Sequence, residues 1–318
     1  MELPAAEDPP SLARCDEELK DGPGSSPIRR GEVRCLMARM DSRRSVGPLE
    51  LIGVPYTSMA NPGGIGNGIK ALRAADLAPR LRAVADLHEG GDLDLPQPSG
   101  VRARSGLLNE PGLVRLVAGT KAAVASAHAA GRIPLLIGGD CPVLLGPLAA
   151  LRDRHGAAAL LMIDGHEDAW PPPLSPTGEA SDSEIALAIG MATDGLSTAL
   201  ADVLPVLEAE ALALLGPRDA ADIVKGGATS LAGQIGLFLD DETLRRLGPD
   251  TVLPGALEVV HRAASRFWLH LDLDALRAED FPAADYLQPA GLSWQQMAVP
   301  CCARARRCAV RGSKRRHL

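Results

Sequence analysis

Seven side chains that can ligate a metal ion lie within or directly after three apolar runs of the sequence. They are Asp140, Cys141, Asp164, His166, Asp168, Asp272 and Asp274. Carboxylates that converge without a cation repel one another, which raises their pKa values and costs stability, and a divalent metal offsets that repulsion. Oxygen-rich ligands with an imidazole suit Mn²⁺, and Fe²⁺, Co²⁺ or Zn²⁺ are also compatible. If Asp164 and Asp272 each bridge, the set suffices for two ions, which generate a hydroxide and orient it for attack.

Each of the three motifs also has an ordinary explanation when it is taken alone. An Asp-x-His-x-Asp spacing, as at 164–168, occurs without metal, and Asp274 could cap a following helix. If none of the motifs binds metal, their three occurrences at the ends of apolar runs are three separate coincidences. The joint pattern therefore favours a metal site.

The elements that must position these motifs alternate between strand and helix along the chain. Strand-like runs lie at 49–54, 81–87, 132–140, 157–164, 211–219, 233–240 and 266–276. Helical spacing covers 68–77, 110–130, 142–153, 183–192 and 251–265. This alternation predicts βαβ units and a parallel sheet, and ligands bind at the carboxyl ends of such strands. Because side chains alternate along an extended strand, we expect Asp164, His166 and Asp168 to share one face.

The composition is that of an α/β protein. Hydrophobic residues make up 46% of the 318-residue chain and aromatic residues only 3%, so the core must consist of Ala, Leu, Val and Ile. This suits helices packed on a parallel sheet. The net charge of −7 gives no reason to expect nucleic acid as a partner. The apolar runs are too short to span a membrane, and the cysteines do not form a disulfide framework, so we predict a cytoplasmic protein.

Three parts of the chain differ in pattern. Residues 1–48 are rich in turn residues and charges, which predicts a disordered leader. Residues 49–300 carry the alternation of strands and helices and form the predicted α/β domain. Residues 301–318 contain seven Lys or Arg and no strand pattern. They predict a basic, disordered tail in preference to an arm that binds nucleic acid or anionic lipid.

The motifs resemble those of a known enzyme family. The stretches IGGDC, DGHED and LDLDAL are similar to the motifs G-G-D-H, D-A-H-x-D and D-x-D-x-x-D-P of the ureohydrolases, the arginase, agmatinase and formimidoylglutamase family. The stretch 51–77 resembles the family's first strand and Gly-rich loop, and GLSWQQM at 291–297 resembles its late helix start. The resemblance covers about residues 49–300, in the family's order.

The resemblance implies a three-layer α/β/α fold with a central, mostly parallel sheet, and two Mn²⁺ ions per chain. It implies that one ion is held by Cys141, Asp164, Asp168 and Asp272, and the other by Asp164, His166, Asp272 and Asp274. A hydroxide that bridges the ions would attack the planar carbon of a small cationic guanidino or formimino substrate and release an amine. Asp140 would orient a ligand or the hydroxide. The family also implies a homo-oligomer, either a trimer or a hexamer.

Cys141 is the first departure from the family pattern, because the family has His at this position. A thiolate can bind metal, and a helix N-terminus would lower its pKa, but sulfur is a soft ligand that matches Mn²⁺ poorly. One site would then be weakened or would select a softer metal. The alternatives are a small buried residue beside a weakened site, or a nucleophile, although no Cys/His pair is visible to support the latter.

The loop 171–184 is the second departure, since it lacks the family's proton-shuttling His. Glu179 and Asp182 are the polar groups left in this loop. They either bind a cationic substrate or cap a helix, with Ser183 as an alternative cap.

The C-terminus is the third departure. Arg277 stands where the third motif has its last Asp. Beyond Met297 the family continues into a strand that ends in an acid facing the guanidinium, whereas this chain has the basic tail. A missing core strand would expose a sheet edge and part of the apolar face.

Two functions of different classes are compatible with these observations. The first is a hydrolase of linear amidines or guanidino compounds, and the preserved Asp and His ligands favour it. The second is a catalytically impaired scaffold or regulatory subunit, which Cys141 and the altered C-terminus favour. The remaining histidines, His270 among them, are scattered and are predicted to be structural or surface residues.

Overall fold

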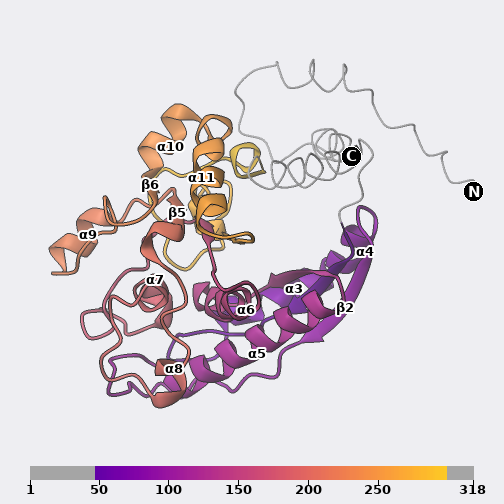
Figure 1. Cartoon of the computed structure of the whole chain (residues 1–318), viewed down its shortest axis with the longest axis horizontal. Helices are drawn as coiled ribbons and strands as arrows, with labels where there is room; N and C mark the ends of the chain where they lie inside the picture. Colours follow the sequence, from indigo (N-terminus) through magenta and orange to yellow (C-terminus); the bar gives the residue numbers. More distant parts are fainter. Residues whose placement is uncertain (1–46, 299–318) are drawn as a thin grey trace, which may run out of the picture.

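The computed structural model describes residues 47–298 and arranges them as parallel strands covered by helices (Figure 1). The strands are β1 (Leu49–Gly53), β2 (Leu87–Asp92), β3 (Ile133–Ile137), β4 (Leu160–Ile163), β5 (Leu212–Leu215), β6 (Leu237–Leu239) and β7 (Trp268–Leu271). The helices are α3 (Gly68–Ala74), α4 (Leu77–Arg82), α5 (Glu110–Ala129), α6 (Leu145–His155), α7 (Glu184–Ala188), α8 (Thr198–Ala201), α9 (Ala220–Lys225), α10 (Asp241–Leu247) and α11 (Pro249–Ala263). The predicted leader and tail lie outside the described residues, apart from Gly47 and Pro48.

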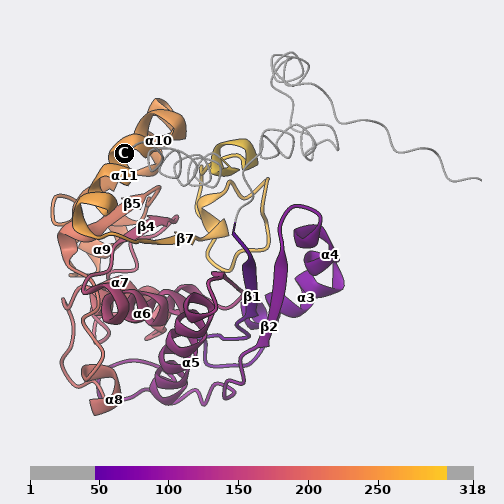
Figure 2. The same ribbon diagram turned by 45° about the vertical axis from the view of Figure 1, so that its right-hand side comes forward.

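All pairs among these strands are parallel, and they form two sheets. The strand orders are β2-β1-β3 and β6-β5-β4-β7. Helices α6 and α11 lie on opposite sides of the second sheet (Figures 1 and 2), and α5 packs on β3 and on α6. The predicted α/β class, with three layers in the order α/β/α and parallel strands in the middle layer, is confirmed.

The core is centred on β4 and β5, whose residues are all buried. Their sequences, LLMI and LALL, are apolar without alternation because the strands are covered on both faces. Helix α7 is buried along its whole length. Leu, Val, Ile and Ala dominate the buried cluster, as the low aromatic content predicts.

Strands β3 and β7 are the end strands of the two sheets, and both are only partly buried. Every residue of β3 keeps some exposure although the sequence IPLLI is apolar. Within residues 47–298, nothing pairs with the outer edge of either strand. The outer edges of β2 and β6 are likewise unpaired within these residues, so the edge expected from a missing core strand stays a prediction.

The predicted strand at 81–87 is wrong. Its first residues belong to the helix α4, and the second strand, β2, begins only at Leu87. The sequence of β2, LHEGGD, is polar because this strand lies at the edge of its sheet and is largely exposed. Leu81 and Val84 produced the apolar run on which the prediction rested. Helices α8, α9 and α10 were not predicted because they are too short to show periodicity.

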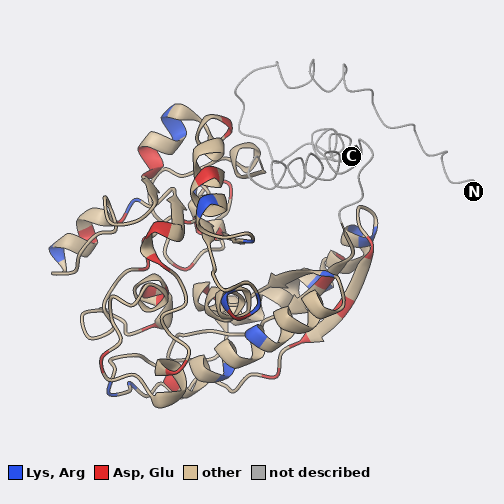
Figure 3. Cartoon of the chain, viewed as in Figure 1, with Lys and Arg blue, Asp and Glu red and all other residues tan. Residues whose placement is uncertain are grey.

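No helix in the described part of the chain is long and apolar enough to cross a membrane. Helix α10 has Asp241 and Glu242 in its first turn and Arg245 and Arg246 in its last, and α5 begins with Glu110 and carries its basic residues further on (Figure 3). A surface for nucleic acid gathers basic residues on one face. The charges of these helices therefore give no support to a nucleic-acid partner.

Candidate metal centre

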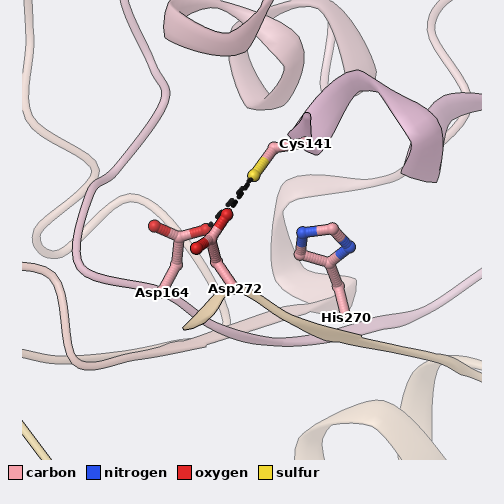
Figure 4. Close-up of side chains that lie close together, drawn as sticks. All are labelled: Cys141, Asp164, His270 and Asp272. Atoms are coloured by element: carbon pink, nitrogen blue, oxygen red, sulfur yellow. Dashed lines mark hydrogen bonds between the residues drawn. The ribbon is translucent and has the colours of Figure 1, made fainter. Parts of the chain in front are cut away.

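The carboxyl ends of β3, β4 and β7 bring one residue from each of the three motifs together (Figure 4). Cys141 Sγ donates a hydrogen bond to Asp272 Oδ2 at 2.8 Å and lies 3.7 Å from Asp164 Oδ2. Asp164 and Asp272 follow directly on β4 and β7, whereas Cys141 lies four residues after the end of β3, which belongs to a different sheet. The predicted convergence of the motifs is present in the structure.

Asp164 and Asp272 adopt the same local conformation. In each, Oδ1 accepts a hydrogen bond from the backbone N–H two residues further on, that of His166 at 2.8 Å and that of Asp274 at 2.7 Å. The other oxygen, Oδ2, faces the thiol of Cys141. Asp272 caps a short 3-10 turn in this way, so Asp274 is not the cap. Both carboxylates are thus fixed with one oxygen directed into the cluster.

The second motif converges through a turn and not through strand alternation. Strand β4 ends at Ile163, so the three motif residues lie in a loop, and Asp168 has a left-handed backbone with φ of 49°. Asp164, His166 and Asp168 nevertheless offer ligand atoms that lie within 4.8 Å of one another. The expectation of an extended strand is wrong, because the Asp164 carboxylate closes a turn over the N–H of His166.

His166 and Asp274 form an ion pair on one side of the cluster, with 2.8 Å between Nδ1 and Oδ2. Asp274 Oδ1 also accepts a hydrogen bond from the N–H of Gly165 at 2.9 Å, and Arg218 Nη2 donates to the Asp274 carbonyl at 2.7 Å. Burial opposes the shift, but the hydrogen bond and charge of His166 hold the pKa of Asp274 below its usual value. Against its own burial, the pKa of His166 is raised by Asp274. Groups of the chain therefore satisfy the Asp274 carboxylate, although Nε and Nη1 of Arg218 are buried without a partner.

Among the described residues, the other carboxyl groups of the cluster have no ion pair as close as that of Asp274: His166 Nδ1 lies 3.9 Å from Asp164 Oδ1, further than from Asp274. Burial, followed by the charges of neighbouring acids, raises the pKa of Asp164 and of Asp168 well above the usual value, and that of Asp272 to about 6. Both oxygens of Glu184 are buried without a hydrogen-bond partner. Burial and then the charge of Asp272 also raise the pKa of the Cys141 thiol. The prediction that a helix N-terminus lowers that pKa is wrong, because Cys141 begins a turn of only four residues among acids.

These groups fit a divalent cation, which would relieve the repulsion among buried carboxylates and give their oxygens a partner. Three sets of potential ligand atoms occur among the described residues. They are Cys141, Asp164, His270 and Asp272; Cys141, Asp168 and Glu184; and Asp164, His166 and Asp168. Five of the six predicted ligands belong to these sets, and Asp274 joins them through its bond to His166.

Glu184 and His270 belong to these sets but were not predicted. Glu184 is fully buried in the first turn of α7, where an acid is ordinary, so no sequence pattern marks it as a ligand. His270, expected to be a structural or surface residue, is instead buried in β7 beside three other ligand groups. Burial lowers its pKa to about 4. The signal was its position two residues before Asp272, on the same face of the strand.

Asp140 lies beside the cluster and is anchored by Ser58. Its Oδ2 accepts hydrogen bonds from the Ser58 N–H at 2.7 Å and from the Ser58 hydroxyl at 2.5 Å. Its Oδ1 is buried without a partner. Burial raises the pKa of Asp140 to about 7, against the effect of the Ser58 hydrogen bonds. This placement leaves Oδ1 available to orient a ligand or a water molecule.

Asp182 holds the loop that precedes α7. Its Oδ2 accepts hydrogen bonds from the hydroxyl groups of Ser175 and Thr177. Ser183, which directly precedes α7, makes no side-chain cap bond. The predicted capping role is therefore wrong for both residues, because the Asp182 carboxylate turns back onto its own loop.

Glu179 lies on the Asp140 side of the same loop. It accepts a hydrogen bond from the Tyr286 hydroxyl at 3.3 Å. Its charge contributes to the raised pKa of Asp140, and burial raises the pKa of Glu179 itself. Of the two predicted substrate-binding residues, Glu179 is the one whose charge acts on the candidate centre.

Known proteins resemble the chain over most of its length. The model of the arginase family matches residues 48–309. The chain belongs to the arginase family. It is similar to the arginase of Brevibacillus brevis, with 26% identity over 253 residues that cover 78% of this chain and 82% of that protein.

Two solved structures of the same family share the fold. The arginase of Bacillus caldovelox superposes with a TM-score of 0.67 at 24% identity, covering 79% of this chain and 84% of that one. The formimidoylglutamase of Bacillus subtilis superposes with a TM-score of 0.58 at 16% identity, covering 91% and 85%. The resemblance of the motifs to the ureohydrolases is thereby confirmed. This arginase-family protein is a relative of hydrolases that act on C–N bonds.

Proposed function

We propose that the chain is a hydrolase that uses two divalent metal ions to cleave a C–N bond of a small, linear amidine or guanidino compound. The observation that carries the proposal is the buried cluster around Asp164 and Asp272, whose Oδ2 atoms both face Cys141. In the described part of the chain, the positive groups beside this cluster, His166 and Arg218, both bond to Asp274. Membership of the arginase family supports the reaction class.

The residues of the cluster divide into two overlapping ligand sets. One ion would be held by Cys141, Asp164, Asp168 and Asp272, and the other by Asp164, His166, Asp272 and Asp274. The shared conformation of Asp164 and Asp272 supports a bridging role, because one oxygen of each is fixed by the backbone and the other is free to ligate. Mn²⁺ suits the oxygen-rich set that contains His166. When bound, such ions supply a hydroxide at neutral pH and stabilise negative charge on the substrate.

The chain itself orients the reacting groups and shields them from water. Asp164 is 1% exposed, and Asp140 and Asp168 are also buried. The two bonds from Ser58 fix Asp140 so that its Oδ1 can accept a hydrogen bond from the attacking water or from the substrate. The N–H of Gly165 holds Asp274 in place. Groups held in this way need no reorganisation during the reaction.

A cationic substrate is supported by the acids on the loop side of the cluster. Glu179, Asp182 and Asp285 all act on the Tyr286 hydroxyl, whose pKa they raise together with burial. Their negative potential attracts a guanidinium or formimino cation. Since Asp182 already bonds to two hydroxyl groups, Glu179 is the residue of this group that would contact the substrate.

Product release from a panel of compounds tests the proposal. The metal-loaded chain is incubated with arginine, agmatine, formiminoglutamate and guanidinobutyrate, and urea and ammonia are measured. At least one compound should be hydrolysed by the loaded chain and not by the Asp164→Asn variant. The reaction requires the Cys141 thiol to stay reduced, which fits the predicted cytoplasmic location.

A scaffold or regulatory subunit is the second candidate, and it is favoured by the outer edges of β3 and β7, which no strand of residues 47–298 pairs with. An unpaired strand edge offers a surface for pairing with another chain, and a trimer or hexamer could cover it. Such a protein would bind metal and assemble, but would release no product from any compound of the panel. Light scattering together with the product assay distinguishes the two candidates.

A further inference from the structure

We propose that Cys141 and His270 form a soft-metal site that prefers Zn²⁺ to Mn²⁺, with Asp164 and Asp272 as its other ligands. The inference rests on the proposed metal binding, to which it adds a ligand and a metal preference. The four residues offer one sulfur, one nitrogen and two oxygen atoms, all within 4.8 Å of one another. Figure 4 shows the His270 imidazole beside Asp272, with the Cys141 thiol reaching the two carboxylates from above.

The backbone of β7 fixes the position of His270. His270 lies opposite Met162 in the parallel pair of β4 and β7. The next contact between these chain segments is made by the N–H of Asp272, which donates a hydrogen bond to the Ile163 carbonyl at 2.9 Å. Residues two apart in a strand point to the same face. His270 therefore shares the face of Asp272, and the register of two paired strands holds it there.

The imidazole of His270 is buried and incompletely satisfied. The residue is 8% exposed, and its Nε2 has no hydrogen-bond partner. A buried polar atom without a partner destabilises a protein. A metal ion that also contacts Cys141 and the two carboxylates would give this ring a partner, which an apolar or merely structural role does not.

The donor set decides the metal. Thiolate and imidazole ligands, with one or two carboxylates, are those of four-coordinate zinc sites, whereas Mn²⁺ prefers oxygen ligands. The His166 side offers one imidazole and otherwise carboxylates, and it has no sulfur. The two sides should therefore hold different ions. Zinc binding at Cys141 breaks the S–H bond, forms an S–Zn bond and releases the proton to solvent.

Metal competition on the full chain tests the inference. The chain is stripped of metal and offered equal amounts of Zn²⁺ and Mn²⁺, and the bound metal is measured by elemental analysis. We expect about one Zn²⁺ per chain, held more tightly than Mn²⁺. His270→Gln should lower the zinc affinity at least about tenfold in a chelator competition. His88→Gln, in the exposed strand β2, is the matched control and should bind zinc as the unaltered chain does.

Cobalt reports on the ligands directly. With Co²⁺ in place of Zn²⁺, the chain should show a thiolate-to-cobalt charge-transfer band that Cys141→Ser abolishes. His270→Gln should keep this band and shift the ligand-field bands, because it removes a nitrogen and not the sulfur. A zinc affinity and a cobalt spectrum that His270→Gln leaves unchanged would overturn the inference.

X-ray absorption decides the matter if His270→Gln does not fold. The His166→Gln variant, loaded with one equivalent of zinc, should show one sulfur and one imidazole around the metal, and His270 is then the imidazole of the cluster. A zinc shell without sulfur contradicts the inference. A chain that binds two Mn²⁺ and releases product, but has no preference for zinc, rejects this inference alone. A chain that binds neither ion rejects the proposed function as well.

Discussion

The two sides of the candidate metal centre differ in how their polar groups are satisfied. On one side, His166 bonds to Asp274, which also accepts the N–H of Gly165, and the pKa of Asp274 lies below its usual value. On the other side, His270 and Glu184 have buried atoms without hydrogen-bond partners, and the pKa of the neighbouring carboxyl groups is raised. The chain itself supplies the partners of the Asp274 carboxylate, whereas the second side has buried ligand atoms that a cation would satisfy.

Asp164 and Asp272 connect the two sides. Each has one oxygen bonded to the backbone of the His166 side and the other directed at Cys141. A change at either residue should therefore affect both ions, whereas a change at Cys141 should affect one. The comparison thus predicts an order of effects.

Asp164→Asn should have the largest effect. Loss of a partner that merely orients a metal ligand costs about 10–100-fold, so loss of a shared ligand should lower product release by more than about 100-fold. Metal content should fall on both sides, as measured by elemental analysis. Asp202→Asn, an exposed control, should retain metal and activity. Loss of one ion with retention of the other would show that Asp164 does not connect the two sides.

Metal removal should loosen the Cys141 side more than the His166 side. Free metal at about 100 times its Kd adds about 2.7 kcal/mol to the free energy of unfolding, and a chelator removes this contribution. Amide exchange should then accelerate in α7, which carries Glu184, while the Gly165 amide stays protected by Asp274. Equal acceleration at both places would abolish the distinction between the two sides.

Cys141→His should have a smaller effect of opposite sign. Imidazole is a better ligand than a thiol for Mn²⁺, so the Mn²⁺ occupancy on that side should rise several-fold. Manganese content and the electron paramagnetic resonance of coupled ions are the measurements. An unchanged occupancy, in a variant that folds, would place residue 141 outside the ligand set.

The pH dependence of metal binding should be the mildest effect. Burial and the charge of Asp274 raise the pKa of Asp272 to about 6, so a proton competes with metal for this carboxylate below that pH. Affinity should therefore rise with pH, by about twofold between pH 6 and pH 7 from this carboxylate alone. Chelator competition at about pH 6 and pH 7 measures it. An affinity that falls as the pH rises contradicts the raised pKa values.

The fold could be predicted wherever burial leaves a continuous or periodic run of apolar residues in the sequence. Strands β4 and β5 are covered on both faces and read as continuous apolar runs, and helix α5 is long enough to show its period. Strand β2 could not be predicted, because an exposed edge strand needs no apolar residues. The helices α9 and α10 could not be predicted either, because they are too short to show a helical period.

The site could be predicted in its residues more fully than in its geometry. Acids at three strand ends indicate convergence, since parallel strands end at one edge. The turn at Asp164 could not be foreseen, because an aspartate that bonds to the N–H two residues on leaves the same sequence pattern as an extended strand. His270 could have been found from its position two residues before Asp272, whereas only packing shows that Glu184, in the first turn of α7, faces the cluster.

The number of metal ions bound per chain tests the central claim most directly. The full chain is stripped of metal, loaded with Mn²⁺ and Zn²⁺, freed of excess ions by gel filtration and analysed for its metals. About two ions per chain are predicted, as the overlapping ligand sets around Asp164 and Asp272 require. Fewer than about one ion per folded chain would contradict the claim that this buried cluster is a metal centre.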